Sequence, residues 1–159
     1  MSDPTTFGRI DDDGTVYVKT AAGERAVGSW HAGTPEEGLA HFARRFADIV
    51  TEVDLLEARL NSGTADASHS LSTIRRLRGG LDTAHAVGDL DGLAARLDKL
   101  ASVAEERAGA ARAARDAART EAIARKHALV EEAETIGAES TGWKTAGDRL
   151  KEILDEWKT

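Results

Sequence analysis

TPEEGLAHFARRFADIVTEVDLLEARL, residues Thr34 to Leu60, is the stretch that determines the fold class. Its large apolar residues are spaced alternately three and four positions apart: Leu39, Phe42, Phe46, Ile49, Val53, Leu56 and Leu60. This heptad spacing predicts a helix-pairing seam along one face of a long helix. Thr34 is suited to cap that helix, and Glu37 completes a capping box. A second helix, from this chain or from another copy, must cover the seam.

A small β-sheet is predicted before this helix. The runs FGRI, TVYVKT and ERAVGSW carry β-branched or aromatic residues, and glycine ends each connection between them. Such runs predict a three-stranded antiparallel meander within residues 1–33. Three short strands are not stable alone in water, so we expect the meander to lean on the seam helix, with Trp30 near the junction.

Helical signals follow the seam. NSGTADASHS, residues 61–70, predicts a loop that turns the chain back, which makes residues 34–88 a helical hairpin. The second helix of this hairpin contains Gly79 and Gly80, a pair that costs about 2 kcal/mol relative to alanine. We therefore expect a kink or a break at these two glycines.

The rest of the chain, residues 89–159, is predicted to hold a long alanine-rich helix followed by a last helix. We expect Gly137 and the AESTG run after it, residues 138–142, to stop the long helix, and Ser140 or Thr141 to cap the last one. The predicted fold class is mainly α: an elongated helical hairpin or coiled-coil-like bundle with a small N-terminal three-stranded antiparallel β meander.

Composition narrows the function classes. The 159 residues carry a net charge of −7, which disfavours general coating of nucleic acid. The absence of cysteine excludes disulfides and thiolate metal sites. Because no apolar run approaches the length of a membrane span and no secretion signal is visible, we expect no membrane association and a cytoplasmic location.

No catalytic, cofactor-binding or metal-binding residue is predicted. The Asp11–Gly14 run lacks the alternating ligands of a calcium loop and favours a hairpin turn. No nucleophile elbow or glycine-rich phosphate loop is present. The five histidines lie too far apart in the sequence to indicate a zinc site: His31, His41, His69, His85 and His127.

Two helical surfaces are candidates for binding, besides the outer strands of the meander, which are able to accept a partner strand but are better explained as a cap on the helical hairpin. The first, which we call the basic stripe, lies within about 60° on the alanine-rich helix and consists of Arg112, Arg115, Arg119 and Lys126. Such a stripe suits RNA phosphates or an acidic protein, although Asp116 is placed to pair with Arg112 and leave only a solvated face. The second candidate is a docking face on the last helix, formed by Trp143, Leu150 and Trp157.

The chain also resembles a known family. TGWKTAGDRLKEILDEWK, preceded by EAIARKHALVEEAE, resembles the repeat of the bacterial domain-of-unknown-function family numbered 349. FGRIDDDGTVYVKT, GERAVGSWHAGTPEEGLAHFARRF, EVDLLEARL and AVGDLDGLAARLDKL are similar to the N-terminal region of its long members. The resemblance implies helical repeats, no cofactor and no catalytic residue to carry over. It also implies either a fragment that ends inside the first repeat or an unusually short member.

Three functional hypotheses follow. The first is a non-enzymatic interaction module in the bacterial cytoplasm, a coiled-coil scaffold or adaptor that binds a protein partner and is able to self-associate through its heptad seams. The second is an RNA- or ribosome-associated factor that uses the basic stripe. The third, ranked last, is a helical-hairpin factor that binds RNA polymerase. Its tip at residues 61–70 carries only Asp66, where metal-directed chemistry requires at least two carboxylates.

Overall fold

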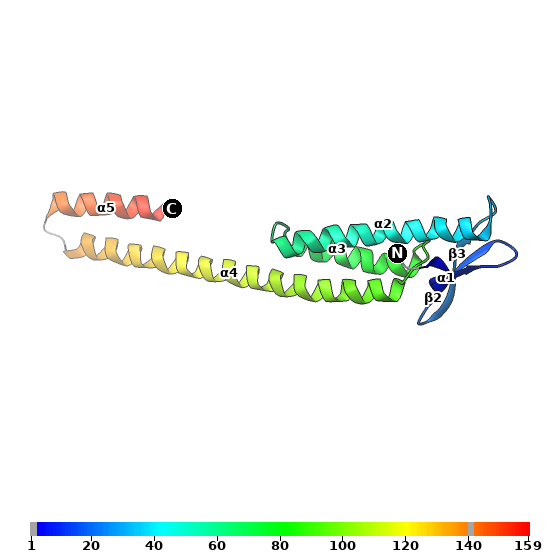
Figure 1. Cartoon of the computed structure of the whole chain (residues 1–159). Coiled ribbons are helices and arrows are strands. Elements are labelled where there is room, and N and C mark those ends of the chain that lie inside the picture. The colour runs from blue at the N-terminus through cyan, green and yellow to red at the C-terminus, as the bar shows by residue number, and fades with distance from the viewer. Residues whose placement is uncertain (1–2, 140–141) are drawn as a thin grey trace. The chain divides into compact units, whose positions relative to one another are not determined.

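A computed structural model of the chain describes residues 3–139 and 142–159 (Figure 1). It contains five α-helices, three strands and one short 3₁₀ helix in the described residues. In chain order they are α1 (Pro4–Phe7), β1 (Gly8–Ile10), β2 (Thr15–Thr20), β3 (Gly23–Ser29), α2 (Pro35–Ser62), α3 (Ala67–Gly80), η1 (Leu81–Thr83), α4 (Leu90–Glu139) and α5 (Trp143–Trp157). The chain forms two compact units, residues 1–109 and residues 110–159, and α4 contributes to both. The predicted fold class, mainly α with a small three-stranded sheet, is confirmed.

The three strands form the antiparallel meander in the order β1-β2-β3. Val16 and Val18 on β2 are buried, and Val27 on β3 joins them in the core. The sheet approaches α2 closely at Gly28, where a Cβ atom would lie 2.7 Å from Cζ of Phe42. Trp30, just after β3, stacks on His41 of α2 with ring centroids 5.2 Å apart. The meander therefore rests on the start of the seam helix, as the sequence predicts.

The start of α2 follows the predicted capping box. The Thr34 hydroxyl accepts a hydrogen bond from the Glu37 backbone N–H, and Glu37 Oε2 accepts one from the Thr34 N–H at 2.8 Å. These two bonds satisfy backbone donors that the first turn of a helix leaves unpaired. Pro35 occupies the first position, where its missing N–H has no cost.

The heptad seam of α2 is covered by helices of the same chain. Leu39, Phe42, Val53 and Leu60 are buried, while Phe46, Ile49 and Leu56 are half-buried against the same core. The residues that cover the seam come from α3, η1, the 84–89 loop and the first part of α4: Ile74, Leu77, Leu81, Val87, Leu90, Leu93, Leu97, Leu100 and Ala104. Residues 1–109 thus form a three-helix bundle with the sheet against one end (Figure 1).

Ion pairs bridge each helix pair of the bundle. Arg76 on α3 pairs with Glu52 on α2 at 2.8 Å, and Arg78 on α3 pairs with Asp98 on α4 at 3.1 Å. Arg96 on α4 pairs with Asp54 and Glu57 on α2. The first two pairs are largely exposed, so each contributes little to the free energy of unfolding. Their value lies in favouring this register of the helices over alternatives.

One sequence expectation about helix ends needs correction, and a second is met within two residues. The loop between α2 and α3 spans only residues 63–66 instead of ten residues, because α2 continues to Ser62 and Asp66 caps α3 by accepting a hydrogen bond from the His69 N–H. The long helix ends within the predicted stop at residues 137–142, since α4 passes Gly137 and ends at Glu139. One glycine costs only about 1 kcal/mol inside a helix, which good helix formers on both sides outweigh.

Other expectations about helix ends agree with the structure or lie outside it. The break predicted at Gly79 and Gly80 is confirmed, because α3 ends at Gly80 and η1 follows. The predicted caps Ser140 and Thr141 lie outside the described residues. In the described residues, no helix is both long enough and apolar enough to cross a membrane.

Candidate interaction surface

The second unit, residues 110–159, is a hairpin of two helices. The short α5 packs against the last part of α4, and the buried residues of this contact are Leu129 on α4 and Ile153 on α5. The pairs Glu132–Arg149 and Lys126–Trp157 connect the two helices in reverse order along the chain. The helices are therefore antiparallel, and the end of α5 lies beside residues 123–130 of α4.

Arg149 is the main polar link of the hairpin. Its Nε and Nη2 atoms donate to the two carboxylate oxygens of Glu132 at 2.5 and 2.8 Å, and Nη1 donates to Glu152 and Glu156 on α5 at 3.1 Å. The hydrogen bonds from Arg149 lower the pKa of Glu132, and the same contacts raise the pKa of Arg149. A bidentate arginine–carboxylate pair fixes the relative orientation of the two side chains in addition to the charge attraction, so it helps to set how α5 lies on α4.

Lys126 and Trp157 meet at the end of α5. The Lys126 ammonium lies 5.2 Å from the centroid of the Trp157 ring, a cation–π distance. Ile123, His127 and Val130 line the same shallow depression. The sequence assigned Lys126 to the basic stripe and Trp157 to the docking face. The structure brings these two separate candidates together.

An apolar groove runs between the two helices. Its lining residues come from α4 and α5: Leu129, Val130, Ala133, Glu134, Leu150, Ile153, Leu154 and Trp157. Several of these side chains stay open to solvent, with Leu154 53% and Trp157 42% exposed. Apolar residues grouped in this way on a surface mark a binding site more often than single exposed ones do.

The predicted docking face is only partly in this groove. Leu150 and Trp157 line it, whereas Trp143 is 91% exposed and does not line it. Trp143 points to the same side of α5 but stands at the other end of the helix. Leu154 and Val130 are groove residues that sequence reasoning missed. The available signal was Leu154 itself, four positions after Leu150 on the same side of the helix.

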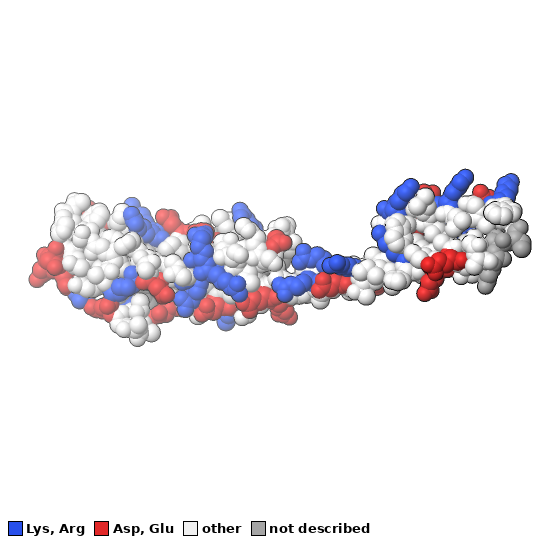
Figure 2. Space-filling view, turned by 180° about the vertical axis from the view of Figure 1, so that it is seen from behind, with Lys and Arg blue, Asp and Glu red and all other residues white. Residues whose placement is uncertain are grey.

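The other members of the basic stripe are free. Arg112, Arg115 and Arg119 are exposed, and none is in an ion pair among residues 3–139 and 142–159. The predicted pair between Arg112 and Asp116 does not form in that part of the chain. Figure 2 shows acidic and basic side chains mixed over the three-helix bundle.

The hairpin and the part of α4 before it match a known protein family. Residues 92–159 match the model of a family described as Domain of Unknown Function (DUF349). This part of the chain is a DUF349 domain. The match begins at Gly92, near the start of α4, so the similarity of the preceding residues to long family members stays an expectation. Searches of curated proteins and of solved structures found no match.

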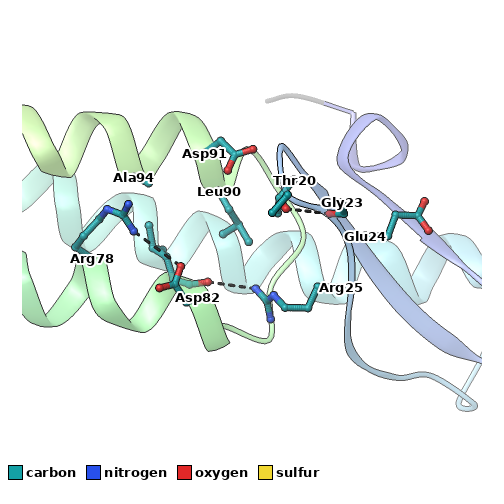
Figure 3. Close-up of a pocket in the computed structure, with 11 residues that line it drawn as sticks. Thr20, Gly23, Glu24, Arg25, Arg78, Asp82, Leu90, Asp91 and Ala94 are labelled. Carbon is teal, nitrogen blue, oxygen red and sulfur yellow. Dashed lines mark hydrogen bonds and ion pairs between the residues drawn. The ribbon is translucent and has the colours of Figure 1, made fainter.

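A second cleft lies before the DUF349 domain and at its edge (Figure 3). It is formed where the β2–β3 hairpin meets α3, η1 and the start of α4. Arg25 donates to the carbonyl oxygens of Leu81 and Ala84 at 3.2 and 3.1 Å, and Asp91 accepts from the Ala21 N–H at 2.7 Å. Arg78 pairs with Asp82 and Asp98. The Arg25 and Asp91 contacts hold the sheet on the bundle, and the Arg78 pairs link α3 to η1 and α4.

The remaining sequence candidates have structural roles. Asp13 accepts a hydrogen bond from the Thr15 N–H in the β1–β2 turn, and this bond lowers the pKa of its carboxyl. The heptad seam is inside the bundle and not part of the DUF349 hairpin. Within the residues that the structure describes, no three His, Asp or Glu side chains are grouped so as to hold a metal ion.

Proposed function

We propose that this chain is a non-enzymatic interaction module, and that its DUF349 domain binds a partner protein in the apolar groove between α4 and α5. The observation that carries the proposal is the group of apolar side chains along this groove, with Leu154 and Trp157 about half exposed. Burying such side chains is favourable in proportion to the apolar area removed from water. A groove between two helices is able to hold an amphipathic helix of a partner, as in other helix-in-groove complexes.

Contacts between α4 and α5 hold the two sides of the groove in place. Leu129 and Ile153 hold its floor, and the Arg149–Glu132 bond fixes the distance between its walls. A preformed groove loses less conformational freedom on binding than a flexible surface does. The amphipathic rings of tryptophan are common anchors in protein interfaces, and Trp157 lines the groove.

An RNA- or ribosome-associated role is the second candidate. The three unpaired arginines of the basic stripe favour it, because arginine binds phosphate well. Against it, the segment from Val103 to Ala122 contains no aromatic residue on which a base would stack. The polymerase-binding alternative has less support, because the Asp66 carboxylate is engaged as the cap of α3.

Two matched variants test the proposal. Leu154 and Thr145 are nine residues apart on α5, so they face about 180° apart. The full chain would be used to capture proteins from a lysate of the source cells, with and without nuclease treatment, at low and high salt. We expect Leu154→Asp to reduce capture of one partner, identified by mass spectrometry, about tenfold or more, since a central apolar anchor is worth at least about 1–2 kcal/mol.

Thr145→Asp is the control, because it adds the same carboxylate on the opposite side of the helix. The partner should be retained by this variant at the level of the unchanged chain. Retention by both variants would contradict docking in the groove. Loss of all captured protein on nuclease treatment would favour the RNA alternative instead.

A further inference from the structure

The apolar groove and the basic stripe lie on one side of α4. At 100° per residue, Arg112, Arg115 and Arg119 point within about 60° of Val130, which lines the groove. Trp157, the last residue of α5, lies beside Ile123 and over Lys126. The side of α4 that meets α5 therefore continues toward the N-terminus as the basic stripe, beginning about 6 Å before Ile123.

Arginines that lie between packed helices of the chain pair with carboxylates, whereas the arginines of the basic stripe lie on an open helix face and do not, like Arg44, Arg45 and Arg59 of α2 in the described residues. Arg75, Arg76, Arg78, Arg96 and Arg149 all pair with carboxylates on a neighbouring helix. Arg112, Arg115 and Arg119 have no such pair in the described part of the chain, although Asp116 stands nearby on α4. Each free guanidinium offers five donors in a planar fork that matches a carboxylate.

Alanines make the surface beside these arginines flat. Ala111, Ala118 and Ala122 point to the same side of α4, next to Arg115, and all three are small. A helix backbone is able to approach such a strip closely, because no long apolar side chain stands in its way. The strip continues the line of the groove, whose floor on α4 is Leu129.

We propose that the groove and the basic stripe form one docking surface, and that its ligand is an amphipathic helix of a partner protein that is apolar at one end and acidic at the other. This rests on the proposed function and adds the chemistry of the partner. From Arg112 to Ala133 the surface is about 32 Å long, the length of a helix of about 21 residues. Glu134, the acidic residue of the groove, lies about 22 Å along α4 from Arg119, so it does not oppose the acidic end.

The test uses two synthetic helical peptides of 21 residues, about the length of the surface. Both carry leucines at i, i+3, i+4 and i+7 in one half. The other half carries glutamates in the first peptide and glutamines in the second. Binding to the full chain is measured by fluorescence anisotropy at low and high salt. We expect the glutamate peptide to bind about tenfold more tightly at low salt, from three exposed charge pairs, and the difference to shrink at high salt.

Two triple variants test whether the preference for the glutamate peptide comes from the basic stripe. Replacing Arg112, Arg115 and Arg119 together by Gln should abolish the preference for glutamate. Replacing the exposed arginines Arg44, Arg45 and Arg59 of α2 by Gln changes the net charge equally and should leave the preference intact. Circular dichroism of both triple variants checks that the helices are retained.

The outcomes separate the two proposals. Equal binding of both peptides, still lost in Leu154→Asp, would overturn the acidic-partner proposal and leave docking in the groove standing. Binding of neither peptide would overturn the acidic-partner proposal, while the capture experiment still decides on the groove. A single-stranded RNA oligonucleotide that binds through the three arginines when the peptides do not would overturn it in favour of RNA.

Discussion

A Leu97→Ala chain is expected to lose about 2–5 kcal/mol of the free energy of unfolding of the three-helix bundle. Leu97 lies on the first part of α4 and is 0% exposed. It belongs to the core formed with the seam residues of α2. Shortening it removes apolar contacts on all sides and leaves a cavity that the packed helices fill only partly. Urea unfolding followed by circular dichroism measures the loss.

Leu55→Ala is the matched control for this prediction. Leu55 lies on α2 beside the seam, but it is 55% exposed. The same chemical change at an exposed position should alter the free energy of unfolding by no more than about 0.5 kcal/mol. A similar loss in both variants, or a loss that depends on protein concentration, would contradict closure of the seam within one chain.

Gly88→Ala is expected to destabilise the bundle by about 1–3 kcal/mol, the usual cost of overpacking. Gly88 is buried in the loop before α4, and a Cβ atom there would lie 2.2 Å from Cδ1 of Phe46 on α2. The preceding residue, Val87, donates its N–H to the Phe42 carbonyl at 3.1 Å, which ties the loop to α2. The contact is with Cγ and Cδ1, close to where the ring joins its backbone, so the ring has to rotate or the loop has to shift to admit the added methyl group.

Gly79→Ala should have the opposite effect. Gly79 is exposed on α3, and a Cβ atom there meets no other atom within 4 Å. Alanine is the better helix former by about 1 kcal/mol, so the melting temperature should rise slightly or stay unchanged. Thermal unfolding of the two variants decides the matter. A fall in both melting temperatures by the same amount would contradict overpacking at Gly88 as the cause of the loss.

Local signals made most of the fold predictable. The capping box at Thr34 and Glu37 depends only on neighbours in the sequence, and the structure has the same two hydrogen bonds. The heptad spacing of α2 indicated which face is buried. The spacing did not indicate which helix covers this face, because any helix with an apolar face of the same length is able to cover it. The bundle depends on residues that lie far apart along the chain and share one core, such as Val53 and Leu97.

The candidate surface was harder to predict, for the same reason. The spacing of α5 groups Trp143, Leu150 and Trp157 on one side, but the position of α4 decides which of them line a groove. Trp143 points to the same side of α5 as the other two residues, but it lies at the opposite end of the helix from Trp157. Lys126 reaches Trp157 across 31 positions of sequence, and no local pattern records such a contact. The sequence therefore described the basic stripe and the tryptophan face as two surfaces.

The most direct measurement of the central claim is photocrosslinking from the groove. Leu154 would be replaced by a photoreactive amino acid in the full chain, and Thr145 would be replaced in a parallel sample. After irradiation in a lysate of the source cells, mass spectrometry identifies the crosslinked peptides. Docking in the groove predicts crosslinks from position 154 to one amphipathic segment of a partner protein, and few from position 145. Equal crosslinking from both positions, or crosslinks from position 154 to RNA alone, would contradict it.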